Sequence, residues 1–209
     1  RAAADPSVNA IVLSGDGGVF TAGNDLDDFR ARAMDENPQP SAGLAFIETL
    51  MACDTPVIAA VEGLAIGIGT TLLLHCDLVI AGRSARFKTA FVDLGLVPEA
   101  ASTVTMPLHL GARKSAELLL MGDTLDGEEA QECGLVSRTV ADGEALPQAL
   151  AQAERLADKP RDALVASKRL MKAPWREMVR EALERERPVF AERLRSEDCR
   201  AALARLGKR

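Results

Sequence analysis

Aromatic residues are scarce in this chain, which has no tyrosine, one tryptophan and six phenylalanines among 209 residues. They are too few for the platforms on which proteins stack nucleic-acid bases. Positive charge is also in deficit, because 25 lysines and arginines face 31 aspartates and glutamates and leave a net charge of −6. This balance argues against nucleic acid or an anionic membrane as the main partner.

Cysteine and histidine are too few and too scattered to suggest a metal site. The four cysteines stand far apart without the spacing of metal ligands, and reduced thiols in a cytoplasmic protein are the plain interpretation. His75 and His109 are isolated, and no serine has a histidine partner in the register of a catalytic triad. We therefore expect no metal centre and no serine-hydrolase site.

Long apolar runs and phosphate-binding motifs are missing as well. The most apolar stretch, residues 56–74, is interrupted by Glu62 and by three glycines, so we expect a strand, a tight turn and a buried helix rather than a membrane span. The Gly67-Ile68-Gly69 segment lacks the third glycine of a dinucleotide fingerprint, and no Lys-Ser or Lys-Thr pair follows it. No nucleotide cofactor is predicted.

The chain does have the composition of a folded enzyme domain, with 47% hydrophobic and 27% charged residues. Strand and helix patterns alternate up to about residue 142, which predicts an α/β fold with a mostly parallel sheet. The expected strands are 8–13, 57–61, 78–81, 85–88 and 135–140, and the expected helices are 25–32, 42–53, 70–74, 111–121 and 126–132.

Residues 143–209 have helical periodicity almost throughout, and Pro160 and Pro174 are expected to break it into separate helices. We therefore predict an α/β core over residues 1–142 and a helical C-terminal region over residues 143–209. Residues 1–5 are expected to form the last turn of a helix whose beginning is absent, and residues 37–41 a mobile loop.

Two glycine-containing turns point to chemistry at a carbonyl group. Residues 20–26 (FTAGNDL) and residues 63–69 (GLAIGIG) each follow an apolar run typical of a strand and precede a helical segment. Backbone N–H groups at the start of a helix have no partner within it. Two such starts directed at one point would form a pair of donors for a developing oxyanion.

Four carboxylates lie in or beside apolar segments, where a charge is costly unless it is paired or used: Glu62, Asp77, Asp93 and Glu99. Glu99 follows Pro98, which suits the first turn of a helix. The helix dipole would favour the charged form of Glu99, and an apolar pocket would oppose it. From spacing alone, a catalytic base and a structural N-terminal acid both remain open.

From residue 7 to the C-terminus the chain resembles the crotonase (enoyl-CoA hydratase/isomerase) superfamily. The stretches that carry the resemblance are 20–26, 56–63 (PVIAAVEG), 76–81 (CDLVIA), 94–99 (LGLVPE), 134–136 (GLV) and 167–170 (SKRL). The resemblance implies a spiral of ββα units, a homotrimer or a dimer of trimers, and an acyl-CoA thioester substrate of fatty acid metabolism. It also implies that the backbone N–H groups of Asn24 and Ile68 stabilise an enolate.

Within the superfamily, the chain is most similar to the peroxisomal-type delta3,delta2-enoyl-CoA isomerases. They share Gly-Asn-Asp-Leu in the first turn and the Leu-Gly-Leu-Val-Pro-Glu segment, whose glutamate corresponds to Glu99. Hydratases carry two glutamates at positions that correspond to Thr71 and Phe91. The resemblance therefore implies that Glu99 moves a proton from C2 to C4 of a 3-enoyl-CoA. A hydratase, another crotonase reaction and a non-catalytic acyl-CoA-binding domain are the alternatives.

The resemblance also implies the surroundings of the substrate. Coenzyme A belongs to the substrate, so no separate cofactor is expected, and residues 143–209 are expected to serve trimer formation or to form a lid. Asp77 is expected to anchor a loop, and Lys168 either to approach the coenzyme A phosphates or to be solvated. Ala100-Ala101-Ser102 replaces a glycine-containing sequence of relatives, and the family's first strands and helix are missing. The expected substrate-binding residues are Ala22, Gly23, Asp25, Leu26, Ala65, Gly67, Gly69, Thr71, Phe91 and Leu96.

Overall fold

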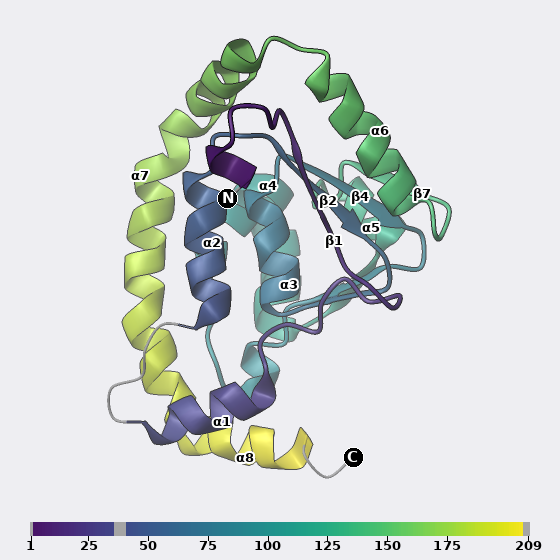
Figure 1. The fold of residues 1–209 in the computed structure, drawn as a ribbon. Helices are drawn as coiled ribbons and strands as arrows, with labels where there is room; N and C mark the ends of the chain where they lie inside the picture. Colours follow the sequence, from purple (N-terminus) through teal and green to yellow (C-terminus); the bar gives the residue numbers. More distant parts are fainter. Residues whose placement is uncertain (1, 36–40, 207–209) are drawn as a thin grey trace.

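The computed structural model describes residues 2–35 and 41–206 (Figure 1). The loop expected at 37–41 lies outside these residues apart from Ser41. Four parallel strands form the main sheet in the order β1-β2-β4-β7, which confirms the expected parallel sheet. These strands are β1 Ile11–Ser14, β2 Val57–Val61, β4 Leu78–Gly82 and β7 Arg138–Val140.

A second sheet of three short strands lies beside the first and was only partly predicted. β3 pairs with β5 in parallel, and β5 pairs with β6 in antiparallel. The sequence pattern predicted β5 as part of residues 85–88 and missed the other two, because β3 lies inside the glycine-containing turn 63–69 and β6 runs directly into the helix cap at Asp126. The strands are β3 Leu64–Ile66, β5 Arg86–Lys88 and β6 Thr124–Asp126.

Some helices begin where a polar side chain bonds to a free backbone N–H group. Asp25 accepts from Asp27 N at the start of α1, and Asp126 and Glu129 form the complete capping box of α5. The α-helices are α1 Leu26–Met34, α2 Ala42–Ala52, α3 Ile68–Thr71, α4 Ser102–Ala116, α5 Gly127–Glu132, α6 Ala145–Ala157, α7 Arg161–Leu194 and α8 Glu197–Leu206. Shorter turns are η1 Ala2–Ala4, η2 Leu72–His75, η3 Val92–Leu94 and the π-helical η4 Glu117–Met121.

Two expectations about helix ends are wrong. α7 runs unbroken through Pro174 and through Pro188, although a proline inside a helix typically costs about 3 kcal/mol. Pro174 is exposed, as is Leu170 four residues earlier, so water can reach the carbonyl that loses its partner. The second error concerns α4, which begins at Ser102 rather than at Pro98 and bends at Gly111, where the predicted helix was to start.

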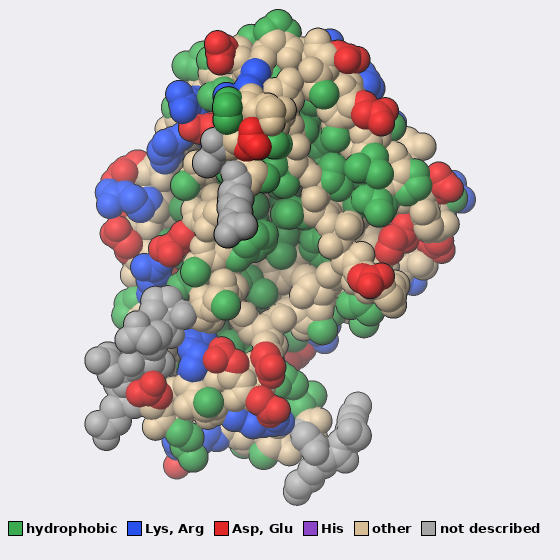
Figure 2. Space-filling view, viewed as in Figure 1, with side chains coloured by type: hydrophobic (Ala, Val, Ile, Leu, Met, Phe, Trp, Pro, Cys, Tyr) green, Lys and Arg blue, Asp and Glu red, His purple; other side chains and the backbone are tan. Residues whose placement is uncertain are grey.

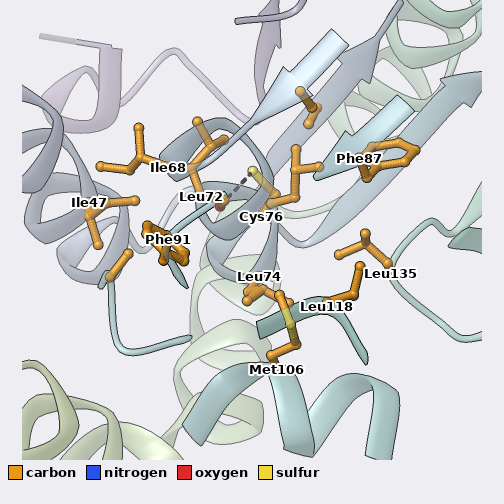
Figure 3. Close-up of a cluster of buried hydrophobic side chains, with 14 of the residues drawn as sticks. Ile47, Ile68, Leu72, Leu74, Cys76, Phe87, Phe91, Met106, Leu118 and Leu135 are labelled. Carbon is orange, nitrogen blue, oxygen red and sulfur yellow. Dashed lines mark hydrogen bonds between the residues drawn. The ribbon is translucent and has the colours of Figure 1, made fainter. Parts of the chain in front are cut away.

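The main sheet is buried on both faces, as is typical of parallel sheets. On one face Ile58 and Ala60 pack against Ala145 and Ala149 of α6. Alternate residues of β2 point to the opposite face and join the main core. Figure 3 shows part of that core, where buried side chains from several elements meet: Leu72 and Leu74 of η2, Phe87 of β5, Phe91 before η3, Met106 of α4 and Leu118 of η4 are among them.

The C-terminal helices wrap around the core and return to its N-terminal part. α7 runs along one side of the molecule, and α8 then lies beside α1 (Figure 1). Arg30 on α1 donates to the carbonyl of Leu203 on α8 at 3.2 Å.

The surface is charged in both signs. Figure 2 shows acidic and basic side chains interspersed around the rim of the face that it displays. Within the described ranges, every helix is too short or too polar to cross a membrane.

Candidate active site

The two glycine-containing turns lie side by side, held by main-chain hydrogen bonds. Thr21 N donates to Leu64 O, and Ile66 N donates to Thr21 O, each at 3.0 Å. Gly67 N donates to Lys88 O at 2.7 Å and ties the second turn to β5. Residues about 40 positions apart in the chain therefore form one rigid unit.

Two features of these turns favour glycine: the close approach of one turn to the other, and backbone with a positive φ. A Cβ on Gly23, which has φ of +92°, would stand 2.7 Å from Ile66 O, and one on Gly69 would stand 2.5 Å from Thr21 Cγ2. Both glycines thus let the two turns approach each other. Gly67 also has a positive φ, of +57°, but a Cβ there would meet no atom within 4 Å, so it borders open space.

A cavity of about 990 Å³ opens at these turns, and it brings together the three expected catalytic residues, Asn24, Ile68 and Glu99. Among the described residues, the backbone N–H groups of Asn24 and Ile68 donate no hydrogen bond to the protein backbone. Both groups therefore remain available as donors. Seven expected substrate-binding residues also line the cavity: Ala22, Gly23, Asp25, Leu26, Gly67, Phe91 and Leu96.

The other three expected substrate-binding residues do not line this cavity. Ala65 and Thr71 are fully buried, and the hydroxyl of Thr71 points to Ile68 O at 3.4 Å. Gly69 abuts Thr21, as described above. All three therefore contact protein rather than the cavity.

Glu99 is buried in the cavity wall, with 6% of its surface exposed. Burial raises the pKa of its carboxyl to about 7, against the opposing effects of a hydrogen bond from Asn24 and of the positive charge of Arg32. The side-chain amide of Asn24 donates to Glu99 Oε1 at 2.9 Å. Sequence reasoning assigned a role only to the backbone of Asn24 and missed this contact.

The other acids that line the cavity are occupied elsewhere. Asp25 is exposed and caps α1, as predicted. Asp27 pairs with Arg30, and Asp93 pairs with Lys88 at 2.9 Å. Both of these acids are exposed, whereas Glu99 is the one buried acid among the described residues of the lining.

The sequence profile of the family described as enoyl-CoA hydratase/isomerase matches residues 1–209, which is the whole chain. The chain belongs to this family. Its α/β fold with a helical C-terminal region is the crotonase fold, as predicted from the resemblance. It is therefore an acyl-CoA enzyme of the enoyl-CoA hydratase/isomerase family.

Curated relatives carry the names of both hydratases and isomerases. The 2,3-dehydroadipyl-CoA hydratase of Escherichia coli (strain K12) is 33% identical over 202 residues, which cover 94% of this chain and 77% of that protein. The probable enoyl-CoA hydratase echA8 of Mycobacterium leprae is 34% identical over 186 residues, covering 89% and 72%. The 1,2-epoxyphenylacetyl-CoA isomerase of Escherichia coli (strain K12) is 37% identical over 164 residues, covering 75% and 62%.

Solved structures of other proteins have the same fold. OdaA of Pseudomonas aeruginosa is 42% identical, with a TM-score of 0.93, and the match covers 100% of this chain and 84% of that one. The enoyl-CoA hydratase/isomerase of Pseudoalteromonas atlantica T6c is 40% identical, with a TM-score of 0.91 and coverage of 100% and 82%.

Outside the cavity, the structure assigns structural roles to the polar residues singled out from the sequence. Asp77 anchors its loop, as expected, by accepting from Val57 N at 2.8 Å and from Lys168 Nζ at 2.6 Å. Lys168 is buried in this ion pair, so the expectation of a solvated or phosphate-facing lysine is wrong. Burial raises the pKa of Cys76 to about 12, so its thiol stays protonated at neutral pH.

His75 is a buried core histidine whose ring has a hydrogen-bond partner. Its Nε2 lies 2.8 Å from Ala100 O, and burial lowers its pKa to about 4, so the ring is neutral at pH 7. His109 is exposed. In the part of the chain that the structure describes, no three histidine, cysteine or acidic side chains gather as metal ligands would.

The sequence did not point to α8 as part of the site. Ala202, Arg205 and Leu206 of this helix line the cavity, and so do Phe29 and Arg30 of α1. The helical spacing of the apolar residues in α8 indicates that this helix has a buried face. It does not indicate which cavity that face borders.

Proposed function

We propose that this protein converts 3-enoyl-CoA thioesters into the conjugated 2-enoyl-CoA isomers. The observation that carries the proposal is Glu99, a buried carboxyl on the cavity wall held by Asn24 and with its pKa raised to about 7. A group with this pKa is ionised in a large fraction of molecules at neutral pH and can both take up and return a proton.

In the proposed reaction, the thioester oxygen accepts hydrogen bonds from the N–H groups of Asn24 and Ile68. The carboxylate of Glu99 removes a proton from C2, and the electrons of the C–H bond form a dienolate. The protonated carboxyl then returns the proton to C4, which moves the double bond into conjugation with the carbonyl. Donors of this kind contribute roughly 3 kcal/mol each to such transition states.

The same residues favour isomerisation over hydration. Hydration requires a positioned and activated water in addition to a proton donor. The two positions that correspond to the hydratase glutamates hold Thr71, which is buried against protein, and Phe91, which gives the cavity an apolar wall. Hydration of 2-enoyl-CoA stays the second candidate, because several relatives are named hydratases.

Further properties of the protein are proposed on the same basis. Coenzyme A enters with the substrate, and no other cofactor takes part. The protein forms a homotrimer or a dimer of trimers in the cytoplasm, with residues 143–209 as the assembly and lid region. The contribution of α8 to the cavity wall supports the lid role. A non-catalytic acyl-CoA-binding domain would have no use for a buried acid in this position.

The test is to incubate the protein with 3-hexenoyl-CoA and to follow the absorbance of the conjugated thioester. Hydration of 2-hexenoyl-CoA is measured in parallel. We expect isomerisation to dominate, with an acidic limb of kcat/KM near pH 7, and we expect Glu99→Gln to lower kcat by about 100-fold or more. Glu184→Gln, which removes an exposed acid on α7, is the control. Glu99→Gln with wild-type activity, or hydration at a comparable rate, would contradict the proposal.

A further inference from the structure

The backbone that follows Glu99 has an unfavourable conformation. Ala100 and Ala101 have φ of 64° and 57°, and among the described residues they are the only ones other than glycine with positive φ. The left-handed region is unfavourable for residues that carry a Cβ. Such conformations persist only where the surroundings hold them. Both residues are fully buried, and they connect Glu99 directly to α4.

The start of α4 cannot hold this turn by itself. Its N-cap residue is Ala101, which has no polar side chain, and the hydroxyl of Ser102 is buried with no hydrogen-bond partner among the described residues. Free N–H groups at a buried helix start need another acceptor.

That acceptor is Glu186, which comes from α7, 85 residues further along the chain. Its carboxylate accepts from Ala101 N at 2.7 Å, from Thr103 N at 3.0 Å and from the hydroxyl of Thr103 at 2.6 Å. Only 6% of the Glu186 surface is exposed. On the other side of the turn, the ring of His75 lies 2.8 Å from Ala100 O.

Charge supports the same arrangement. Burial raises the pKa of Glu186, and its three hydrogen bonds oppose this effect and favour the ionised form. The charged groups that act on this turn are Arg185 on α7, Arg32 on α1 and Glu99 itself, while His75 is neutral. The negative charge of Glu186 in turn raises the pKa of Glu99.

We propose that Glu186 is a positioning residue for Glu99. By accepting hydrogen bonds from the N–H groups of Ala101 and Thr103, it holds the left-handed Ala100–Ala101 turn and so aims the Glu99 carboxyl at the cavity and at Asn24. The proposal rests on the proposed function for the catalytic role of Glu99, and it links the C-terminal helix α7 to the proton transfer.

If Glu186 only capped α4, its loss would change the stability of the fold and not the chemistry of Glu99. The test therefore measures turnover and the pKa of Glu99 in a folded variant. Glu186→Gln keeps the size of the side chain but offers a single acceptor oxygen and no charge. We expect kcat for 3-hexenoyl-CoA to fall by about tenfold and KM to change by less than about twofold. The assay is run near pH 9, where Glu99 is ionised in both proteins. Glu184→Gln, the same change two residues away on the exposed face of α7, should have no effect.

The pKa of Glu99 is a second readout that does not depend on turnover. In carboxyl-labelled protein, the Glu99 resonance is assigned by its loss in Glu99→Gln and titrated by NMR. We expect Glu186→Gln to lower this pKa, because a neighbouring negative charge is removed and the carboxyl is held less firmly in its buried position. An unchanged kcat together with an unchanged Glu99 pKa in the folded variant would overturn the proposal.

Two further outcomes are separated by this design. If the wild-type protein does not isomerise 3-hexenoyl-CoA, the proposed function fails, and the NMR titration alone supports or overturns the positioning role. If Glu186→Gln does not fold, Thr103→Val replaces it, since it removes one of the three hydrogen bonds from an exposed side chain. We then expect a two- to threefold loss of kcat, about the effect of one weak hydrogen bond, and wild-type kcat would overturn the proposal.

Discussion

The Glu99 carboxyl should make the free energy of unfolding fall as the pH rises, and Glu99→Gln should remove this effect. Burial raises the pKa of this carboxyl from 4.5 to about 7 in the folded protein, and unfolding restores its ordinary value. Between these two values the folded state binds more protons than the unfolded state, so stability present below the lower pKa is lost as the pH rises through the higher one. A pKa difference of about 2.5 corresponds to a loss on the order of 3 kcal/mol.

The assay is urea unfolding of the wild type and of Glu99→Gln near pH 5 and near pH 8.5. Glutamine can accept the same hydrogen bond from Asn24, so the variant changes the charge and little else. Comparing the two proteins cancels every other titrating group. We expect them to agree within about 1 kcal/mol near pH 5, and the variant to be more stable by on the order of 3 kcal/mol near pH 8.5. An equal difference at both pH values would refute the reasoning.

Three further predictions concern residues around Glu99 and the loop anchor. Asn24→Ala should raise the pKa of Glu99 by about one unit, because a hydrogen bond to the ionised form is lost, and shift the acidic limb of the pH–rate profile upward by as much; an unmoved limb would rule this out. Gly43→Ala places a Cβ 2.6 Å from Asn24 Oδ1, so kcat should fall about tenfold while the free energy of unfolding changes by less than ~1 kcal/mol. Lys168→Met should lower the free energy of unfolding by about 2 kcal/mol, because it leaves the half-buried Asp77 carboxylate with one fewer charged hydrogen-bond partner. The matched control, Arg169→Ala, removes an exposed ion pair and should leave it nearly unchanged.

Features set by neighbouring residues could be predicted from the sequence. The capping box of Asp126 and Glu129, the Asp25 cap and the buried strand β2 all depend on side chains within a few positions of one another. The helix break at Pro160 belongs to the same class, because proline removes a hydrogen bond at its own position. Local chemistry decides such elements, and the printed sequence contains it.

Features set by distant residues could not be predicted. Helix α7 passes through Pro174 because its buried face, which includes Val179, Leu183 and Phe190, packs along the core and outweighs a local penalty. The left-handed conformation of Ala100 and Ala101 contradicts their own preference. The residues that determine the path of α7 at Pro174 and the conformation of Ala100 and Ala101 lie far away in the sequence, so the neighbouring residues alone could not predict either feature.

The candidate site also combines features that the sequence could predict with features that only the folded chain shows. The resemblance pointed to Asn24, Ile68 and Glu99, and all three line one cavity of the structure. It did not reveal the hydrogen bond from the Asn24 side chain to Glu99, because two residues 75 positions apart meet only in the folded chain. The raised pKa of Glu99 depends on burial, which is likewise a property of the fold.

The helical C-terminal region is part of the site rather than an appendage to it. Ala202 and Arg205 of α8 form a wall of the cavity, and Arg30 of α1 ties that helix down through the carbonyl of Leu203. Glu186 of α7 binds the backbone immediately after Glu99. Residues 1–142 alone would therefore leave the cavity open on one side and the turn behind Glu99 without its acceptor. A carboxyl that owes its raised pKa to burial needs both parts of the chain in place before it can act as a base near neutral pH.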